Sequence, residues 1–230
     1  IGAGLVFFFY FRNKQPNKNA PKSVDEETRD KSVWKDYPFI GFILLVMCFA
    51  IVFFQLFGTW PIYHREQFML SEQEIGLLLG LNGIIVFLFE MILVYKIGEK
   101  ISIHKLIVFG TVLNGLAFIC LYAIEAKFGL YIACVIISFA EIFAMPFMVT
   151  HTVNRSGKKN KGAYMGLYAM GFSSAFMFAP LVGTNLIAEI GFRHTWLVLA
   201  IFAFFVAISF YVVMKKIRPQ VKSGSVIVTE

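Results

Sequence analysis

Six long apolar stretches dominate the sequence and constrain its fold more than any other feature. They lie at residues 39–60, 74–97, 103–124, 129–152, 162–188 and 193–214. A helix needs about 20 apolar residues to cross the hydrocarbon core of a bilayer, and every stretch reaches that length. The alternation of apolar and polar residues that marks barrel strands is missing. We therefore predict an all-α fold, a polytopic membrane bundle of six transmembrane helices.

The composition argues against a water-soluble enzyme and against a disordered chain. Of the 230 residues, 58% are hydrophobic and 15% are charged. Soluble domains are about half apolar and about a quarter charged, and a soluble globule cannot bury this much apolar surface. Cys48, Cys120 and Cys134 stand inside apolar stretches without metal-ligand spacing, so we expect no disulfide scaffold and no metal site. Since no catalytic motif is visible, we also expect no catalytic residues and no enzymatic activity.

The distribution of lysine and arginine predicts how the chain is oriented in the membrane. Basic residues concentrate in residues 12–36, 96–105, 155–161 and 215–222. These segments share one side of the predicted spans, and the other side has only Arg65, Lys127 and Arg193. Because basic loops stay inside, we expect a cell (inner or plasma) membrane protein with a cytoplasmic linker and C-terminus. The net charge of +7 follows from this topology, so the expected partner is the lipid bilayer and not nucleic acid.

The segments before and after the six spans predict that they are part of a longer membrane protein. Residues 1–11 are apolar but too short to span, so we interpret them as the end of a truncated transmembrane helix. Residues 12–38 are mostly polar and predict a cytoplasmic central linker. The six-helix bundle then occupies residues 39–216, and residues 217–230 form a cytoplasmic tail. This organisation is that of the second half of a twelve-span protein, whose missing N-terminal six-helix half we expect as a partner.

Two carboxylates inside the predicted spans are the candidates for proton coupling. Glu141 lies near the middle of residues 129–152. Glu90 is displaced from the centre of residues 74–97 by about 7 Å toward the cytoplasmic end. Hydrocarbon disfavours a charged carboxylate, which allows such a group to bind and release a proton near neutral pH. A permanently protonated structural glutamate is the alternative for each. A proton gradient would then be the energy source, and no cofactor is expected.

Other polar side chains within the spans are candidates to line a substrate cavity. They are Gln55, Asn82, Ser138, Tyr164, Tyr168 and Ser173. Ser138 lies three residues before Glu141 and therefore shares its helix face. Pro146, Pro180 and Gly183 are expected to bend helices, because proline removes a backbone hydrogen bond and glycine permits close packing. A set of aromatic residues suits flat, apolar substrates: Phe53, Phe54, Trp60, Phe87, Phe89, Tyr168, Phe172 and Phe176.

Four stretches of the sequence match the pattern of a known family. They are LLLGLNGIIVFLFEMILVYKIGEK, SFAEIFAMPF, KGAYMGLYAMGFSSAFMFAPLVGTNL and GFRHTWLV. They resemble the eighth, tenth and eleventh spans, and the turn into the twelfth, of the major facilitator superfamily, in particular its drug-exporter-like bacterial members. The loop at residues 98–105 departs from the family, because it lacks the Asp-Arg pair of the gating-loop motif. The resemblance covers essentially the whole chain and implies two six-helix bundles that hold substrate between them.

The resemblance implies a secondary transporter, proton-coupled, that moves small organic molecules by alternating access. Residues 39–60, 74–97, 129–152 and 162–188 would face the cavity, while the other two spans would lie outside. Efflux is favoured, and a proton-coupled importer of peptides, sugars or organic anions is the alternative within this class. A membrane-embedded enzyme and a non-transporting membrane sensor are the alternatives from other classes.

Overall fold

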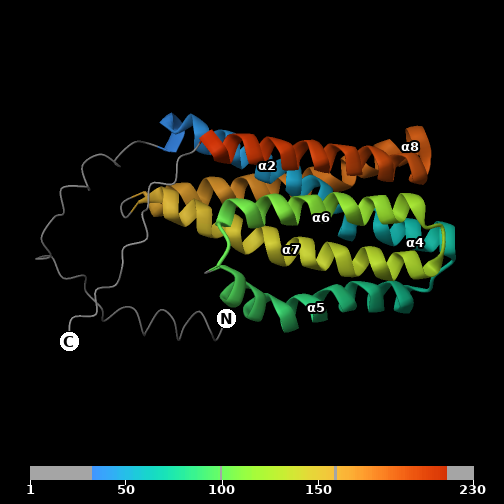
Figure 1. Cartoon of the computed structure of the whole chain (residues 1–230). Coiled ribbons are helices and arrows are strands. Elements are labelled where there is room, and N and C mark those ends of the chain that lie inside the picture. Colours follow the sequence, from blue (N-terminus) through green and yellow to red (C-terminus); the bar gives the residue numbers. More distant parts are fainter. Residues whose placement is uncertain (1–32, 99, 158–159, 217–230) are drawn as a thin grey trace, which may run out of the picture. The chain divides into compact units, whose positions relative to one another are not determined.

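The computed structural model describes residues 33–98, 100–157 and 160–216, and these residues are helical with no strand among them (Figure 1). The all-α fold class is confirmed. The predicted truncated helix at residues 1–11, residues 12–32 of the predicted linker and the predicted tail at residues 217–230 lie outside the described residues.

The elements follow one another with short connections. They are η2 (Val33–Lys35), α2 (Tyr37–Phe53), α3 (Gln55–Gly58), α4 (Trp60–Phe68), α5 (Glu72–Gly98), α6 (Ile103–Ala123), α7 (Lys127–Ser156) and α8 (Lys161–Lys216). Within the described residues, five helical segments are long and apolar enough to cross a membrane, with α2 and α3 counted as one and α8 as another.

Helix α8 contains the two last predicted spans. Gly191 in its middle has φ 75° and ψ 170°, which is not a helical conformation and which strains any residue other than glycine. The helix therefore consists of a first arm, residues 161–190, and a second arm, residues 192–216. Figure 1 shows the chain reversing between the arms, so that α8 crosses the bundle twice. With both arms counted, the structure has the six crossings that the apolar stretches predict.

The helical path that begins at Tyr37 does not end with the first apolar stretch. The apolar segment runs from Tyr37 to Gly58, and α4 continues it after a short break at Thr59. Pro61 lies in the first turn of α4, where its missing N–H leaves no hydrogen bond unmade. The proline is therefore compatible with the continuing helix.

The two ends of the bundle can be named by the residues that lie there. The Asp36 end holds the starts of α2, α6 and the first arm of α8, and the ends of α5, α7 and the second arm. The Gly191 end holds α4 and the turn between the arms. Aromatic side chains pack near both, with Phe42 against Phe210 at the Asp36 end (centroids 5.8 Å apart) and Tyr63 against Trp196 at the Gly191 end (5.1 Å).

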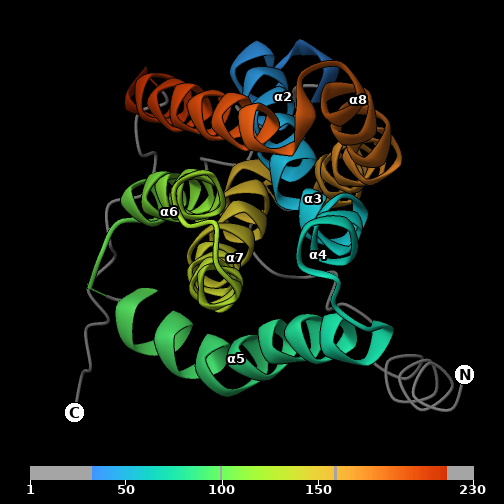
Figure 2. The same cartoon turned by 90° about the vertical axis from the view of Figure 1, so that its right-hand side faces the viewer.

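The helices are buried to very different degrees. Helix α6 packs against α7 and α8 and buries residues along its whole length, and at Gly110 its backbone lies so close to Ala144 of α7 that a Cβ would come within 2.7 Å of the Ala144 nitrogen. Helix α5 packs mainly on α7, at one side of the bundle (Figure 2), and only Leu78, Asn82 and Ile85 of it are buried. The close approach of the α6 and α7 backbones at Gly110 is of the kind that commonly drives helix association in lipid.

Candidate functional site

Glu141 on α7 lies in a hydrogen-bonded cluster that connects α7 to α5. Asn82 of α5 donates from Nδ2 to Ser138 Oγ (3.0 Å) and to Glu141 Oε2 (3.3 Å). Ser138 Oγ donates to the Cys134 carbonyl (2.7 Å), and the Cys134 thiol donates to the Leu78 carbonyl of α5 (3.2 Å). Asn82 and Ser138 are buried, and Glu141 is partly buried. The structure thus brings together three of the predicted site residues.

Helical periodicity explains why these side chains meet. Leu78, Asn82 and Ile85 are spaced four and three residues apart and form the one buried stripe of α5. Cys134, Ser138 and Glu141 have the same spacing on α7, so they too form one stripe. The two stripes face each other where α5 packs on α7. The same-face relation of Ser138 and Glu141 was predicted, and Asn82 was one of several polar residues considered as partners for the acid; the structure shows that Asn82 contacts both.

The electrostatic surroundings of Glu141 are simple. Within the described residues its hydrogen bond comes from the neutral amide of Asn82, and no cation forms an ion pair with it. Glu90 lies on α5, as Asn82 does, and the described part of the chain shows no hydrogen bond to it. An ionised carboxylate can only accept hydrogen bonds, but a protonated one can also donate. Glu141 can therefore exchange one hydrogen-bonding pattern for another when it gains a proton.

A second polar cluster joins α3 to the first arm of α8. Gln55 is fully buried, and its Nε2 donates to the Ala179 carbonyl (2.8 Å), while Thr59 Oγ1 donates to Gln55 Oε1 (3.0 Å). Gly183 packs against these side chains so closely that a Cβ would overlap both Gln55 Oε1 and Thr59 Cγ2. The amide of Gln55 is therefore used inside the protein, and Gly183 is required by this close approach.

A proline lies within one helix of each cluster, α7 and the first arm of α8. Pro146 follows Glu141 by five residues within α7, and Pro180 lies in the first arm of α8 directly after Ala179. Each lacks the N–H that would bond the carbonyl four residues earlier. Both helices continue through their proline.

Four of the predicted aromatic residues form one group where the junction of α2 and α3 meets the first arm of α8. The ring of Phe54 meets Phe172 and Phe176 edge-on, at centroid distances of 5.4 and 5.1 Å, and Tyr168 packs on Phe172 at 5.5 Å. Phe176 is 58% exposed, whereas Tyr168 is buried. We call Phe54, Tyr168, Phe172 and Phe176 the aromatic cluster.

The other predicted aromatic and polar residues lie elsewhere. Trp60 is buried against Phe118, with ring centroids 5.8 Å apart, and Phe53 is likewise part of the core. Phe87 and Phe89 are exposed on α5, and Ser173 is exposed on the first arm of α8. The described residues contain no group of three or more His, Cys, Asp or Glu side chains that could hold a metal ion.

Tyr164, predicted as a cavity residue, belongs instead to a charged cluster at the Asp36 end. Asp36 accepts two hydrogen bonds from Arg155, from Nε to Oδ2 (2.7 Å) and from Nη2 to Oδ1 (2.6 Å). The Tyr164 hydroxyl donates to the same carboxylate at 2.9 Å, and the Phe39 backbone N–H donates at 3.3 Å, which makes Asp36 the N-cap of α2. The cluster thus joins α2, α7 and the first arm of α8.

Asp36 lies within the predicted linker at residues 12–38, and it was not predicted as a site residue. Burial favours the neutral form of Asp36, but the hydrogen bonds from Arg155 and Tyr164 and the charge of Arg155 outweigh it and hold the pKa of Asp36 below its usual value. An aspartate directly before Tyr-Pro is a recognisable helix-capping signal. Its partners are 119 and 128 residues away, and no local pattern could have found them.

The apolar crossings and their close packing define a multi-pass helical membrane protein. The family model of the Major Facilitator Superfamily matches residues 1–121 and 44–226, which together cover almost the whole chain. The chain therefore belongs to the major facilitator superfamily, whose members are secondary transporters. No curated protein matches the chain.

Proposed function

We propose that the chain is the C-terminal six-helix half of a proton-coupled transporter of the drug-exporter-like bacterial type, which moves small organic molecules and favours efflux. Glu141 carries the proton in this proposal, and Glu90 is the second candidate. The observation that supports it best is the contact of Glu141 and Ser138 with Asn82, because it places an ionisable group at a junction between two helices.

Protonation of Glu141 would change how strongly α5 and α7 are held together. When Glu141 is ionised, its hydrogen bond from Asn82 is charge-assisted and about twice as strong as a neutral one. Protonation removes this advantage and gives Glu141 a hydroxyl that needs an acceptor. The bond from Asn82 to Ser138 does not depend on the proton and keeps the helices in register. The proton therefore biases the helix pair between a tighter and a looser state, as alternating access requires.

In this proposal Glu90 is the second proton-binding group and exchanges protons with Glu141. It lies eight residues after Asn82, about 12 Å further along α5 toward the Asp36 end. Two ionised carboxylates would repel each other, and a proton on either of them would remove this repulsion. We assign Glu90 the weaker role, since it contributes no described hydrogen bond between helices.

The aromatic cluster is the proposed substrate surface. It presents ring edges and faces from both the junction of α2 and α3 and the first arm of α8, and Phe176 leaves it accessible. Such a surface suits flat, amphipathic molecules, which gain from stacking as well as from apolar contact. The buried and internally bonded Gln55 next to it would set the spacing of the two helices and would not contact substrate.

We further propose that the Asp36 end faces the cytoplasm of a cell membrane and that an N-terminal six-helix half completes the cavity. The concentration of basic residues at this end supports the orientation. The exposed apolar face of α5, which includes Leu77, Phe87 and Met91, supports a covering partner in addition to lipid. A complete cavity between two bundles would account for the exposure of Phe176.

The test is substrate flux in proteoliposomes that contain the full-length parent under an imposed pH gradient. Glu141→Gln keeps the size and the hydrogen-bond acceptor but cannot titrate, so uphill transport should be lost while downhill exchange persists. Glu90→Gln should have a milder effect. Glu125→Gln, which alters an exposed carboxylate at the Gly191 end, is the matched control and should transport as the parent does.

Two outcomes would contradict the proposal. If Glu141→Gln transports uphill at the parent's rate with unchanged pH dependence, Glu141 is a structural acid. If the parent accumulates substrate inside vesicles that are more alkaline than the medium, substrate and protons move in the same direction, as in a proton-coupled importer. Absence of any substrate-dependent flux would instead favour the sensor alternative.

A further inference from the structure

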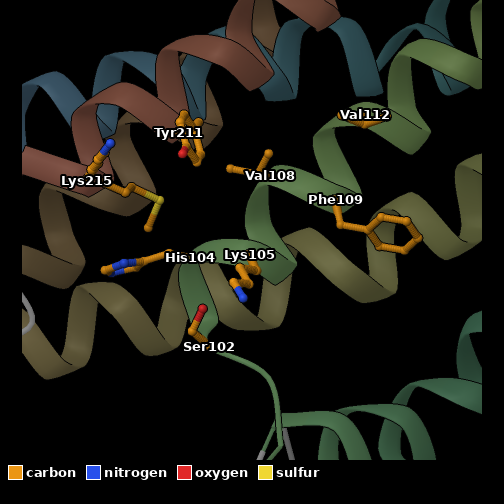
Figure 3. Close-up of a pocket in the computed structure, with 9 residues that line it drawn as sticks. Ser102, His104, Lys105, Val108, Phe109, Val112, Tyr211 and Lys215 are labelled. Atoms are coloured by element: carbon orange, nitrogen blue, oxygen red, sulfur yellow. The ribbon is translucent and has the colours of Figure 1, made fainter.

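A groove between α6 and the second arm of α8 lies at the Asp36 end, apart from the Glu141 site. Its volume is about 450 Å³, and Figure 3 shows the side chains that line it. Its lining includes Ser102, Lys105, Val108, Val112, Tyr211 and Lys215. These residues belong neither to the Glu141 site nor to the aromatic cluster.

The mouth of the groove is cationic. Lys105 of α6 and Lys215 of α8 are exposed on its opposite walls, and the Lys215 ammonium lies over the Tyr211 ring, 6.0 Å from its centroid. Helix α6 begins here, and its N-cap residue Ser102 makes no side-chain capping hydrogen bond. The first N–H groups of α6 and the positive end of its dipole therefore add to the two lysine charges. The mouth favours an anion.

The groove continues into an apolar channel. A second cavity of about 270 Å³ shares Val108, Val112 and Tyr211 with the first. Its other lining residues are Phe204, Ala207 and Ile208. Lys105 and Val112 are seven residues apart, so the channel runs about 10 Å along α6 from the charged mouth. A charged mouth followed by an apolar channel matches a molecule with an anionic head and an apolar tail.

We propose that this groove binds an anionic phospholipid, with the headgroup phosphate between Lys105 and Lys215 and one acyl chain in the channel. Both walls belong to membrane-spanning helices, so the groove opens where bilayer lipid is present. A zwitterionic lipid offers the same phosphate and the same chains, but its ammonium group would face two lysines. The charges of the mouth therefore select for a net negative headgroup. This inference does not depend on the proposed transport function.

The experiment compares two photoactivatable lipids that have identical diazirine-bearing acyl chains. Phosphatidylglycerol and phosphatidylcholine probes are added separately to the full-length parent in nanodiscs, and the cross-linked peptides are mapped by mass spectrometry. We expect phosphatidylglycerol to label residues 108–112 and 204–208 in clear excess over phosphatidylcholine. Each lysine near an anionic surface contributes about fivefold in affinity, so Lys105→Gln with Lys215→Gln should remove most of this excess. Lys161→Gln, an exposed lysine at the same end on the first arm of α8, is the matched control.

The comparison of the two lipids on the unmodified protein tests the proposal even if the variants do not fold. Equal labelling by the two lipids, or labelling spread evenly over the lipid-facing helices, would overturn the proposal. Millimolar inorganic phosphate should leave the labelling unchanged, because it lacks the acyl chain. If phosphate abolishes the excess instead, the mouth is a site for free phosphate and the lipid assignment is wrong.

Discussion

Asp36 offers the most direct test of how the Asp36 end is held together. Its carboxylate accepts two hydrogen bonds from Arg155 and one from Tyr164, and it caps α2 through Phe39. The Asp36→Ala substitution removes all four. Loss of an N-cap costs about 1 kcal/mol. The ion pair is largely buried, with side-chain exposures of 13% for Asp36 and 25% for Arg155, so its loss should cost about 2 kcal/mol, between the exposed and the fully buried cases.

The expected destabilisation is therefore about 3 kcal/mol. For a chain of this length, each kcal/mol lowers the melting temperature by about 2–4 °C, so Asp36→Ala should melt about 6–12 °C lower. The assay is thermal unfolding of the purified protein in detergent. Arg155→Ala and the double variant complete a double-mutant cycle, which should show a coupling of about 2 kcal/mol. Tyr164→Phe should cost about 1 kcal/mol.

The ion pair of Arg193 with Glu125 is the matched control. Its N–O distance is 3.3 Å, but the side chains are 60% and 64% exposed, so Glu125→Ala should cost less than about 0.5 kcal/mol. The assignment of Asp36 as the residue that joins these helices is contradicted if Asp36→Ala is no more destabilising than Glu125→Ala, or if the cycle shows no coupling.

The pH dependence of the same pair can be worked out with its sign. The pKa of Asp36 is held below its ordinary value of 3.8 in the folded protein. Its contribution to stability is therefore complete above that value and is lost only as the pH falls through the lower folded pKa. The difference in stability between wild type and Asp36→Asn should stay constant from about pH 8 to pH 5. A difference that shrinks within this range would contradict the assignment.

Three further predictions follow from single features. Gly183→Ala should destabilise by about 1–3 kcal/mol, because its Cβ would displace Gln55 and Thr59, while Gly166→Ala, where a Cβ would meet no atom within 4 Å, should be nearly neutral in the same melting assay. Burial lowers the pKa of His64 to about 4, so its neutral form contributes stability that is lost as the pH falls from about 6.5 to 4, by about 3 kcal/mol in total. His64→Phe should flatten that part of the stability profile, and an unchanged profile would argue against a buried neutral His64. In a cysteine-free background in intact cells, Gln67→Cys should react with an impermeant thiol reagent and Lys100→Cys should not, and the reverse pattern would invert the proposed orientation.

The sequence alone was sufficient for the fold class and for the approximate helix positions. A transmembrane helix satisfies its own backbone hydrogen bonds, so its existence depends on the length of a local apolar run. Residues 162–188 and 193–214 are two separate apolar stretches, so the break between the two arms of α8 could also be predicted. Its position at Gly191 came from the structure. The shared face of Ser138 and Glu141 also follows from local periodicity alone.

Tertiary packing decided the partners of these residues. Asn82 meets Ser138 and Glu141 across 56 and 59 residues, and Arg155 meets Asp36 across 119. Tyr164 and Asn82 looked alike in the sequence, as polar residues within apolar spans, yet they lie in different clusters. Which helices pack together, and with what axial offset, depends on the fit of entire helix surfaces, such as the close approach at Gly110. Local sequence determines which residues share a helix face, but only the packed bundle determines what that face meets.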